Sequence, residues 1–598
     1  MASGTQASHR RTNRQWWFLL TAAPVALVLG TVGYLTYQSE HLHQPAHVLS
    51  ALYQAAQLFV LNAPQLEHPV HWTLEAGRWL AAACFGLAVL LTLHRFFRTE
   101  WRRFRTSLAG PHVVVCGLGE LGLRLAIEYR QAGRRVTSIE VAANALAIET
   151  AHDRGIAVVV GDARDSQVLR ESRVARADSL IAVCEDDATN IGVASAVGRE
   201  LAHAAGRKRP LECWLFVANP QLRATLREGD VFPHASPNYR VNVRGLDLTE
   251  LHARLLFQQQ PLDYAPIAPD SAVRVHLVVA GFGQMGCSLA LQAARIGHFA
   301  NSRRLRLTIV DRDAASRLVA FKRCYPRLRK VCQVEALEAP ADEGELSRFL
   351  AGLRVGGDEL VTYAVCFESP APPLHARDEL NLSVGLSLGR SLRDTDAQIH
   401  IFLSNTDGAA ALLPHDGRHP TCSRLHAFGM IEDICCLSTL LHEEQDQLAQ
   451  ALHEAHLAHE KYDEQGKERA DFGTKPGHGP WEALPESLKE ANRQAADHVP
   501  VKLRALGYHL VPRELAISPI TAFSREQIRL LAPVEHARWC ASRWLDGWRY
   551  SRSRDDARRL HHDLIPWEKL PEKERHIDVC LATDVPQAIA KVGKAICR

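Results

Sequence analysis

The feature that most constrains this chain is a stretch of 22 residues without a charge, over residues 16–37. About 20 consecutive apolar residues cross the hydrocarbon core of a bilayer, and the aromatic residues at both ends of this stretch suit the membrane interfaces. A cleaved signal peptide is the alternative, because Arg10, Arg11 and Arg14 precede the stretch. However, the stretch is long and no clear small-residue cleavage site follows it, so we expect a transmembrane helix over residues 16–37.

A second apolar segment covers residues 79–93 and extends back to residue 72 across Arg78. The arginine can snorkel to the interface or face other helices, so we expect a second transmembrane helix over residues 72–94. Five arginines follow within residues 95–105, whereas residues 38–71 have almost no Lys or Arg. Positive charge resists translocation, so the N-terminus (1–15) and the basic linker (95–110) are expected in the cytoplasm, and the loop 38–71 outside. The linker arginines also suit contact with anionic lipid.

The external loop contains a short amphipathic helix, predicted within residues 46–64 from the helical spacing of Leu49, Leu52, Tyr53 and Phe59. Two helices with a short re-entrant helix between them are typical of channel subunits, so Gln57, Phe59 and Asn62 are candidate pore residues. The segment lacks a run like T-V-G-Y-G, so it does not support potassium selectivity. A helix lying at the outer interface of a plain anchor explains the same residues equally well.

Residues 111–265 carry the signature of a dinucleotide-binding Rossmann domain. A buried strand is predicted over residues 112–116, and a glycine triplet spaced G-x-G-x-x-G then opens a helix. The first glycine permits the tight turn, the second lets backbone approach a pyrophosphate, and the third lets the helix pack on the strand. Strand 136–140 ends in a carboxylate that can accept from ribose hydroxyls, and strand 156–160 precedes a Gly-Asp-Ala step. The candidate site residues are Gly117, Leu118, Gly119, Glu120, Leu121, Gly122, Glu140, Asp162 and Ala163.

The pattern repeats over residues 272–425, as an internal duplication would. Strand 275–280 leads into a second glycine triplet, and strand 305–310 ends in a carboxylate. The third strand, expected near residues 331–334, lacks the Gly-Asp step, and the fourth is expected over residues 360–367. Rossmann-like folds often persist as structural partners after losing a ligand, so occupancy of this second site stays open. Its candidate residues are Gly281, Gly283, Gly286 and Asp311.

The glycine triplet, the acidic end of the second strand, the Gly-Asp-Ala step and Asn190 together resemble the Trk-type domain, also called RCK for regulator of potassium conductance. The resemblance covers residues 111–226. It implies binding of NAD, NADH or another adenine nucleotide, control of an ion channel or transporter, and a homo-oligomer such as a tetramer. Glu140 favours an unphosphorylated ribose, although Arg134 and Arg135 lie nearby.

The C-terminal segment, over residues 530–595, resembles the ryanodine-receptor repeat, or RyR domain, which in prokaryotes is a small helical module. The resemblance rests on E-H-A-R-W at residues 535–539, G-W-R-Y at residues 547–550 and the segment around P-W-E at residues 566–568. Tryptophans offer flat apolar surface and arginines offer forks for phosphate or carboxylate, although the tryptophans of a small domain are also expected in its core. The candidate ligand residues are Arg538, Trp539, Trp548, Arg549 and Trp567.

The expected fold class is two transmembrane helices followed by α/β, with tandem Rossmann-like parallel-sheet domains. A mainly α-helical C-terminal region follows, made of a helical connector (430–525) and the RyR domain. Fourteen cysteines without a C-x-x-C pair indicate reduced thiols, with no zinc or disulfide framework, and no metal site is expected. Both termini are expected in the cytoplasm of a prokaryote, with the chain crossing the inner membrane.

The sequence favours a nucleotide-sensing, ligand-gated membrane protein, an ion channel or channel-like effector. The net charge of +3 does not indicate a nucleic-acid partner, which leaves the lipid bilayer, a nucleotide and further copies of the chain. The chain shows no nucleophile elbow, P-loop lysine or metal signature, so enzyme activity is not expected, and an NAD-dependent oxidoreductase is a minor alternative. The main alternative is a membrane-anchored nucleotide-binding signalling protein without a pore.

Overall fold

The computed structural model describes residues 3–41, 47–60, 62, 70–107, 112–142, 145–202, 210–228, 241–340, 342–353, 356–369, 377–404, 424–434, 443–462, 467–469, 472–474 and 476–598. The side chains of residues 3–20 and 94–107 lie outside this description. The chain forms two compact units, Met1–Ala109 and Gly110–Arg598.

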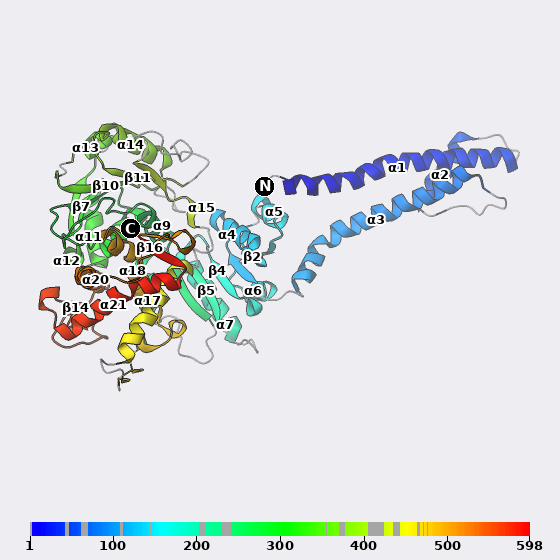
Figure 1. Cartoon of the computed structure of the whole chain (residues 1–598). Helices are drawn as coiled ribbons and strands as arrows, with labels where there is room; N and C mark the ends of the chain where they lie inside the picture. The colour runs from blue at the N-terminus through cyan, green and yellow to red at the C-terminus, as the bar shows by residue number, and fades with distance from the viewer. Residues whose placement is uncertain are drawn as a thin grey trace. The chain divides into compact units, whose positions relative to one another are not determined.

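The N-terminal unit consists of two long helices and a short one (Figure 1). They are α1 (Ser3–His41), α2 (Val48–Gln57), which continues into the 3-10 turn η1 (Leu58–Val60), and α3 (Trp72–Ser107). Helix α3 packs along α1 through small residues, because a methyl group on Gly33 would lie 2.6 Å from the backbone of Leu74. Close approach through glycine and alanine is typical of helices that pack within a membrane.

Within the described residues, Trp72–Leu93 of α3 is the one stretch long and apolar enough to cross a membrane. The expected first span, residues 16–37, begins among side chains outside the description, so two transmembrane helices stay a prediction. Likewise, the arginine cluster of the linker falls on α3, but its side chains are not described.

The second unit begins with a parallel sheet of six strands in the order β3-β2-β1-β4-β5-β6. This is the strand order of a dinucleotide-binding Rossmann fold, whose ligand crevice lies where β1 and β4 diverge. The strands are β1 (Val113–Cys116), β2 (Val136–Glu140), β3 (Ala157–Val160), β4 (Ser179–Ala182), β5 (Leu211–Phe216) and β6 (Val241–Leu246). The helices are α4 (Glu120–Gln131), α5 (Ala145–Asp153), α6 (Ser166–Glu171), α7 (Asp187–Ala202), α8 (Pro220–Glu228) and α9 (Leu248–Gln259).

A second six-stranded parallel sheet repeats this order as β12-β11-β10-β7-β8-β9. Its strands are β7 (Arg274–Ala280), β8 (Arg306–Asp311), β9 (Gln333–Glu338), β10 (Glu359–Val365), β11 (Gln398–Phe402) and β12 (Leu425–Phe428). The third strand was predicted near residues 331–334, but it begins later, at Gln333, because the short helix α12 (Leu328–Val331) precedes it. The other helices are α10 (Gln284–Ile296), α11 (Ala314–Cys324), α13 (Glu343–Ala351), α14 (Asp378–Ser391) and α15 (Ile431–Ile434).

The C-terminal region is mainly helical, as predicted, with two small sheets. Strand β13 (His509–Pro512) pairs antiparallel with the last strand, β16 (Lys594–Cys597), so the expected connector and the RyR segment share one sheet. They also share a core, in which Leu452 and Leu503 of the former pack with Val585 of the latter. The elements are α17 (Glu443–Lys461), α18 (Glu486–Asp497), α19 (Val499–Ala505), α20 (Arg525–Leu545), β14 (Arg549–Tyr550), β15 (Leu560–His561) and α21 (Glu572–Lys591).

Candidate nucleotide-binding site

The glycine loop of the first Rossmann domain packs tightly at two of its glycines and is open at the third. Gly117 has a φ of +96°, and a methyl group there would lie 2.9 Å from the carbonyl oxygen of Val183. A methyl group on Gly122 would lie 1.9 Å from the carbonyl oxygen of Gly117, so helix α4 packs directly on the loop. By contrast, no described atom lies within 4 Å of a methyl group placed on Gly119, the N-cap of α4. The loop therefore leaves the helix N-terminus, which attracts anions, accessible.

Glu140 lies at this loop, as the sequence predicts for a ribose-binding carboxylate. It ends β2, and its Oε2 accepts a hydrogen bond from the backbone N–H of Leu118 at 2.5 Å. Its Oε1 accepts from the N–H of Ala142 at 2.9 Å. The carboxylate is thereby fixed beside the crevice, only partly buried, with lone pairs left to accept from a ligand hydroxyl.

The other predicted residues of this site differ in what they offer. The side chain of Asp162 accepts from Arg164, with 2.7 Å between Oδ2 and the guanidinium, and this hydrogen bond lowers the pKa of Asp162. Ala163 is buried in the core. Glu120 is exposed and forms an ion pair with Arg124, so it contributes only its backbone to the loop. Leu121 packs against the core beneath.

Cys184 follows β4 at the same crevice. Burial raises the pKa of its thiol to about 11, so the group is neutral at physiological pH and is a weak nucleophile. The Sγ donates toward the carbonyl oxygen of Cys116 at 3.6 Å. The described crevice thus offers a carboxylate and an open glycine loop, with a neutral thiol beside them.

The second Rossmann domain has the same glycine loop, but different side chains lie against it. Gly281 has a φ of +93°, and Asp311 accepts from the N–H of Phe282 at 2.8 Å, as Glu140 does from Leu118. Here, however, Arg317 forms an ion pair with Asp311 at 3.0 Å. A methyl group on Gly283 would lie 2.2 Å from a carboxylate oxygen of Glu368. Gly286 again packs on the first glycine of its triplet, since a methyl group there would lie 2.2 Å from that glycine's carbonyl oxygen.

A cavity of about 1,100 Å³ opens at this second loop. Its lining includes Gly283 and Glu368 from the second domain, and Asn219 and Asp247 from the ends of β5 and β6 of the first domain. The space therefore lies between the two Rossmann domains, at the carboxyl ends of strands, where α/β proteins bind ligands.

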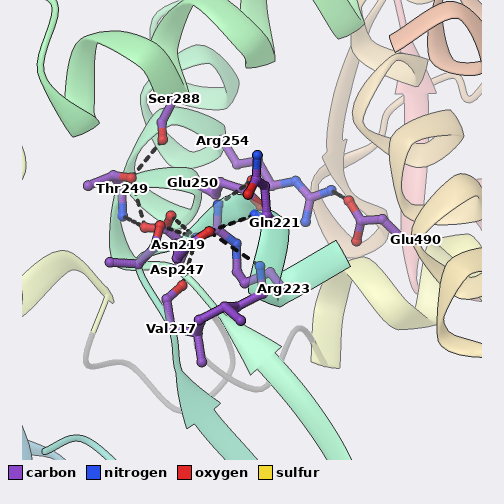
Figure 2. Close-up of polar contacts among 12 residues, drawn as sticks. Val217, Asn219, Gln221, Arg223, Asp247, Thr249, Glu250, Arg254, Ser288 and Glu490 are labelled. Carbon is purple, nitrogen blue, oxygen red and sulfur yellow. Dashed lines mark hydrogen bonds and ion pairs between the residues drawn. The ribbon is translucent and has the colours of Figure 1, made fainter. Parts of the chain in front are cut away.

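Figure 2 shows polar contacts at the end of the first Rossmann domain beside this cavity, one of which reaches Ser288 of the second domain. Arg223 on α8 is buried and forms ion pairs with Asp247 at 2.6 Å and with Glu250 at 3.1 Å. Thr249 on α9 lies 2.6 Å from the hydroxyl of Ser288 on α10, so the end of the first domain is tied to the glycine-loop helix of the second. These residues gave no sequence motif, because each pairs with a residue distant in the chain.

The RyR segment gathers three of its predicted ligand residues but not the other two. Trp539 and Trp548 lie against the ring of His561, with centroids 5.0 and 6.1 Å away, and Trp567 lies 5.8 Å from His536. All three tryptophans are half-buried. Arg549 on β14 is exposed.

Arg538, a predicted ligand residue, lies in the interior, and its charge is paired there. The side chain is buried, and its guanidinium lies 2.6 Å from the carboxylate of Glu535. That carboxylate also pairs with Lys502 at 2.5 Å. The sequence signal was available, since residues three apart on a helix are neighbours.

Among the described residues, His561, His562 and Asp563 bring candidate metal-ligand atoms within 4.8 Å of one another, although no metal site was expected. His561 Nδ1 accepts the backbone N–H of Asp563 at 3.1 Å. One ring nitrogen is therefore occupied, which weakens the case for a metal at this cluster.

The candidate pore residues lie on or after the short helix α2. Gln57 and Phe59 are half-buried and Asn62 is exposed. The predicted apolar face of α2 points outward, with Leu49 and Tyr53 81% and 68% exposed, while Ala51 and Ala55 are buried within the unit. That face is free to contact lipid or a second copy of the chain.

Two segments of the chain match known domain families, as predicted. Residues 113–209 match the TrkA-N domain and residues 519–598 match the RyR domain. Over 97 residues the chain is 27% identical to Potassium channel protein 1 of Methanocaldococcus jannaschii. This match covers 16% of this chain and 29% of that protein. The chain thus spans less than a third of that relative's length.

The chain also matches solved structures at low identity and low TM-score. The GsuK channel bound to NAD is 13% identical with a TM-score of 0.37, covering 73% of this chain and 84% of that chain. GsuK bound to ADP is 16% identical with a TM-score of 0.36, covering 73% of this chain and 99% of that chain. The chain therefore has one segment similar to the TrkA-N domain and another similar to the RyR domain.

Proposed function

We propose that this chain is a nucleotide-sensing membrane protein whose first Rossmann domain binds NAD, NADH or another adenine nucleotide. The open glycine loop carries this proposal, since Gly119 has no described neighbour where a pyrophosphate would approach, and Glu140 lies beside the loop. Its role is binding rather than catalysis, because the crevice offers a carboxylate, backbone amides and a neutral thiol.

The bound state controls the membrane segment, which forms an ion channel or a channel-like effector in a homo-oligomer, with a tetramer as the expected state. Support comes from Potassium channel protein 1, which shares 97 residues of similarity with this chain, and from the apolar span at Trp72–Leu93. A ligand shifts such an assembly only by its differential affinity for two states. The cytoplasmic placement of both termini follows from the arginines after the second span.

A membrane-anchored signalling protein without a pore is the second candidate. The outward apolar face of α2 favours it, since an interfacial helix buries such a face in lipid. Ion flux through liposomes containing the purified chain, measured with and without nucleotide, separates the two. Flux that responds to nucleotide supports the channel, and silence under every nucleotide tried supports the anchor.

Replacement of Gly119 by alanine tests nucleotide binding. The unliganded chain has room for the methyl group, whereas a bound pyrophosphate does not. In calorimetric titrations of the full chain with NAD, NADH and ADP, Gly119→Ala should weaken binding at least about tenfold, or about 1.4 kcal/mol, with unchanged melting. Gly357→Ala, also in open space, is the matched control and should bind as the wild type does. Equal affinity in Gly119→Ala would refute the site.

A further inference from the structure

The two Rossmann domains can be superposed residue by residue through a shared asparagine. Asn190 Oδ1 accepts from the N–H of Cys184 at 2.8 Å, and Asn381 Oδ1 accepts from the N–H of Phe367 at 2.9 Å. Cys184 and Phe367 are therefore equivalent positions after the fourth strand of each sheet. It follows that the next residues, Glu185 and Glu368, are also equivalent.

The side chains of these two glutamates lie in different surroundings. Glu185 is exposed to solvent. Glu368 instead turns into the glycine loop, where Oε2 accepts from the N–H of Gln284 at 2.9 Å and Oε1 accepts from the N–H of Met285 at 2.5 Å. Both amides belong to the first turn of α10, which is the anion-binding end of the helix. The carboxylate of Glu368 thus lies where the first domain leaves space for a phosphate.

A phosphate and this carboxylate cannot share the loop. A methyl group on Gly283 would already lie 2.2 Å from Glu368 Oε2, so no room remains for a second group there. Two anions at such a separation also repel each other strongly in a partly buried site. The position where Asp311 would accept from a ribose is also occupied, by the side chain of Arg317. Its guanidinium pairs with Asp311 and donates to the carbonyl oxygen of Phe282 at 2.9 Å.

We propose that Glu368 is a specificity-determining residue, which fills the pyrophosphate position of the second Rossmann domain and limits each chain to one adenine nucleotide. This inference rests on the proposed function, because the one nucleotide counted is the nucleotide proposed to bind at the first domain. The cavity of about 1,100 Å³ at the loop gives a nucleotide room once the carboxylate is removed. Glu368→Ala should therefore open a site that the wild type keeps closed.

Native mass spectrometry of the full chain with ADP and with NAD tests the stoichiometry. The wild type should bind one nucleotide per chain and Glu368→Ala two, while Glu185→Ala, the matched control at the equivalent position, should still bind one. Two nucleotides on the wild type, or one on a folded Glu368→Ala at the same ligand concentration, would overturn the inference. Glu368→Ser also shortens the side chain and replaces the alanine variant if that variant does not fold. It too should gain a second nucleotide.

The double variant Gly119→Ala, Glu368→Ala separates this inference from the proposed function. If both hold, its first site is at least about tenfold weaker, so at a nucleotide concentration that does not fill this weakened site it binds one nucleotide per chain, at the second loop. If the wild type binds none and Glu368→Ala binds one, the proposed first site fails and the role of Glu368 stands. If the wild type binds one and neither Glu368 variant binds more, only the role of Glu368 fails.

Discussion

Buried charged side chains in the C-terminal region lie against specific polar partners, and His536 on α20 is the clearest example. Its Nδ1 lies 3.1 Å from the carboxylate of Asp578, and its Nε2 lies 2.9 Å from the carbonyl oxygen of Ile565. Because both partners are acceptors, both ring nitrogens carry protons. Burial lowers the pKa of His536, but the hydrogen bonds and charges of Asp578 and Cys540 together outweigh it and raise the pKa to about 10.

This imidazolium gives the region a pH-dependent stability. A folded-state pKa of about 10, above the unfolded value of 6.5, stabilises the fold fully below pH 6.5, and the effect is lost as pH rises towards 10. His536→Gln should lower the free energy of unfolding by about 2 kcal/mol at pH 6.5, and by less at pH 10. Thermal melts of the full chain at both pH values measure it. A deficit equal at both pH values would show that the ring is neutral.

Glu140 and Glu368 show what the sequence can predict about a site. Glu140 was predicted from its place at the end of the second strand after a glycine triplet, and the structure places it at the loop. The placement of Glu368 was not predicted, although Glu185 occupies the equivalent position. Strand order fixes where a backbone position lies, whereas packing selects the rotamer that turns one carboxylate inward and leaves the other in solvent.

At the scale of elements, the N-terminal unit depends on close contact between α1 and α3. Ala26, Gly30 and Gly33 on α1 face Leu74 and Gly77 on α3, and a methyl group on Gly77 would lie 2.8 Å from the backbone nitrogen of Gly30. The backbones approach closely because these side chains are small.

Gly33→Val should therefore separate the two helices. A methyl group at Gly33 meets the backbone of Leu74 at 2.6 Å, and a backbone cannot retreat as a flexible side chain can. Cys84, buried on α3, reports the change. Its alkylation by N-ethylmaleimide in detergent, followed by peptide mass spectrometry, should accelerate at least about fivefold, since exposure governs thiol reactivity. Gly86→Val is the control, because Gly86 has open space around it. Equal rates for the two variants would show that the contact is dispensable.

Some strands of the two sheets were predicted from the sequence and others were not, for a physical reason. The strands that flank the glycine loops are continuous apolar runs and were found, whereas β5 and β6 and the equivalent β11 and β12 extend the sheets beyond the four predicted strands. Strand β6 reads V-N-V-R-G-L, in which Asn242 and Arg244 interrupt the apolar run. Their polar groups are paired in the structure, Asn242 with Glu212 at 3.0 Å, which a single sequence does not reveal.

Across the second unit, buried ion pairs connect the first Rossmann domain to the C-terminal region. Arg254 on α9 lies 2.5 Å from the carboxylate of Glu490 and 2.9 Å from that of Asp497, both on α18 (Figure 2 shows the contact with Glu490). Helix α9 directly follows β6 and carries Thr249, which contacts α10 of the second Rossmann domain. We therefore expect a change at one domain to reach α18 through these charges, because they have no water to replace a lost partner.

Arg254→Met should break this connection. Two carboxylates are left in a buried setting without their cation, so we expect a loss of about 3 kcal/mol in the free energy of unfolding. In the wild type, a nucleotide at 100 times its Kd stabilises the folded chain by about 2.7 kcal/mol, and this should appear as slower amide hydrogen exchange in α18 as well as at the glycine loop. In Arg254→Met the protection should remain at the loop and be lost in α18.

Arg393→Met is the control, because that arginine is exposed with its partner Asp394 and should leave the protection of α18 unchanged. Protection of α18 that persists in Arg254→Met would mean that the binding signal travels by another contact, such as Thr249 to Ser288. No protection of α18 in the wild type, despite protection at the loop, would mean that nucleotide binding stays local to the first domain.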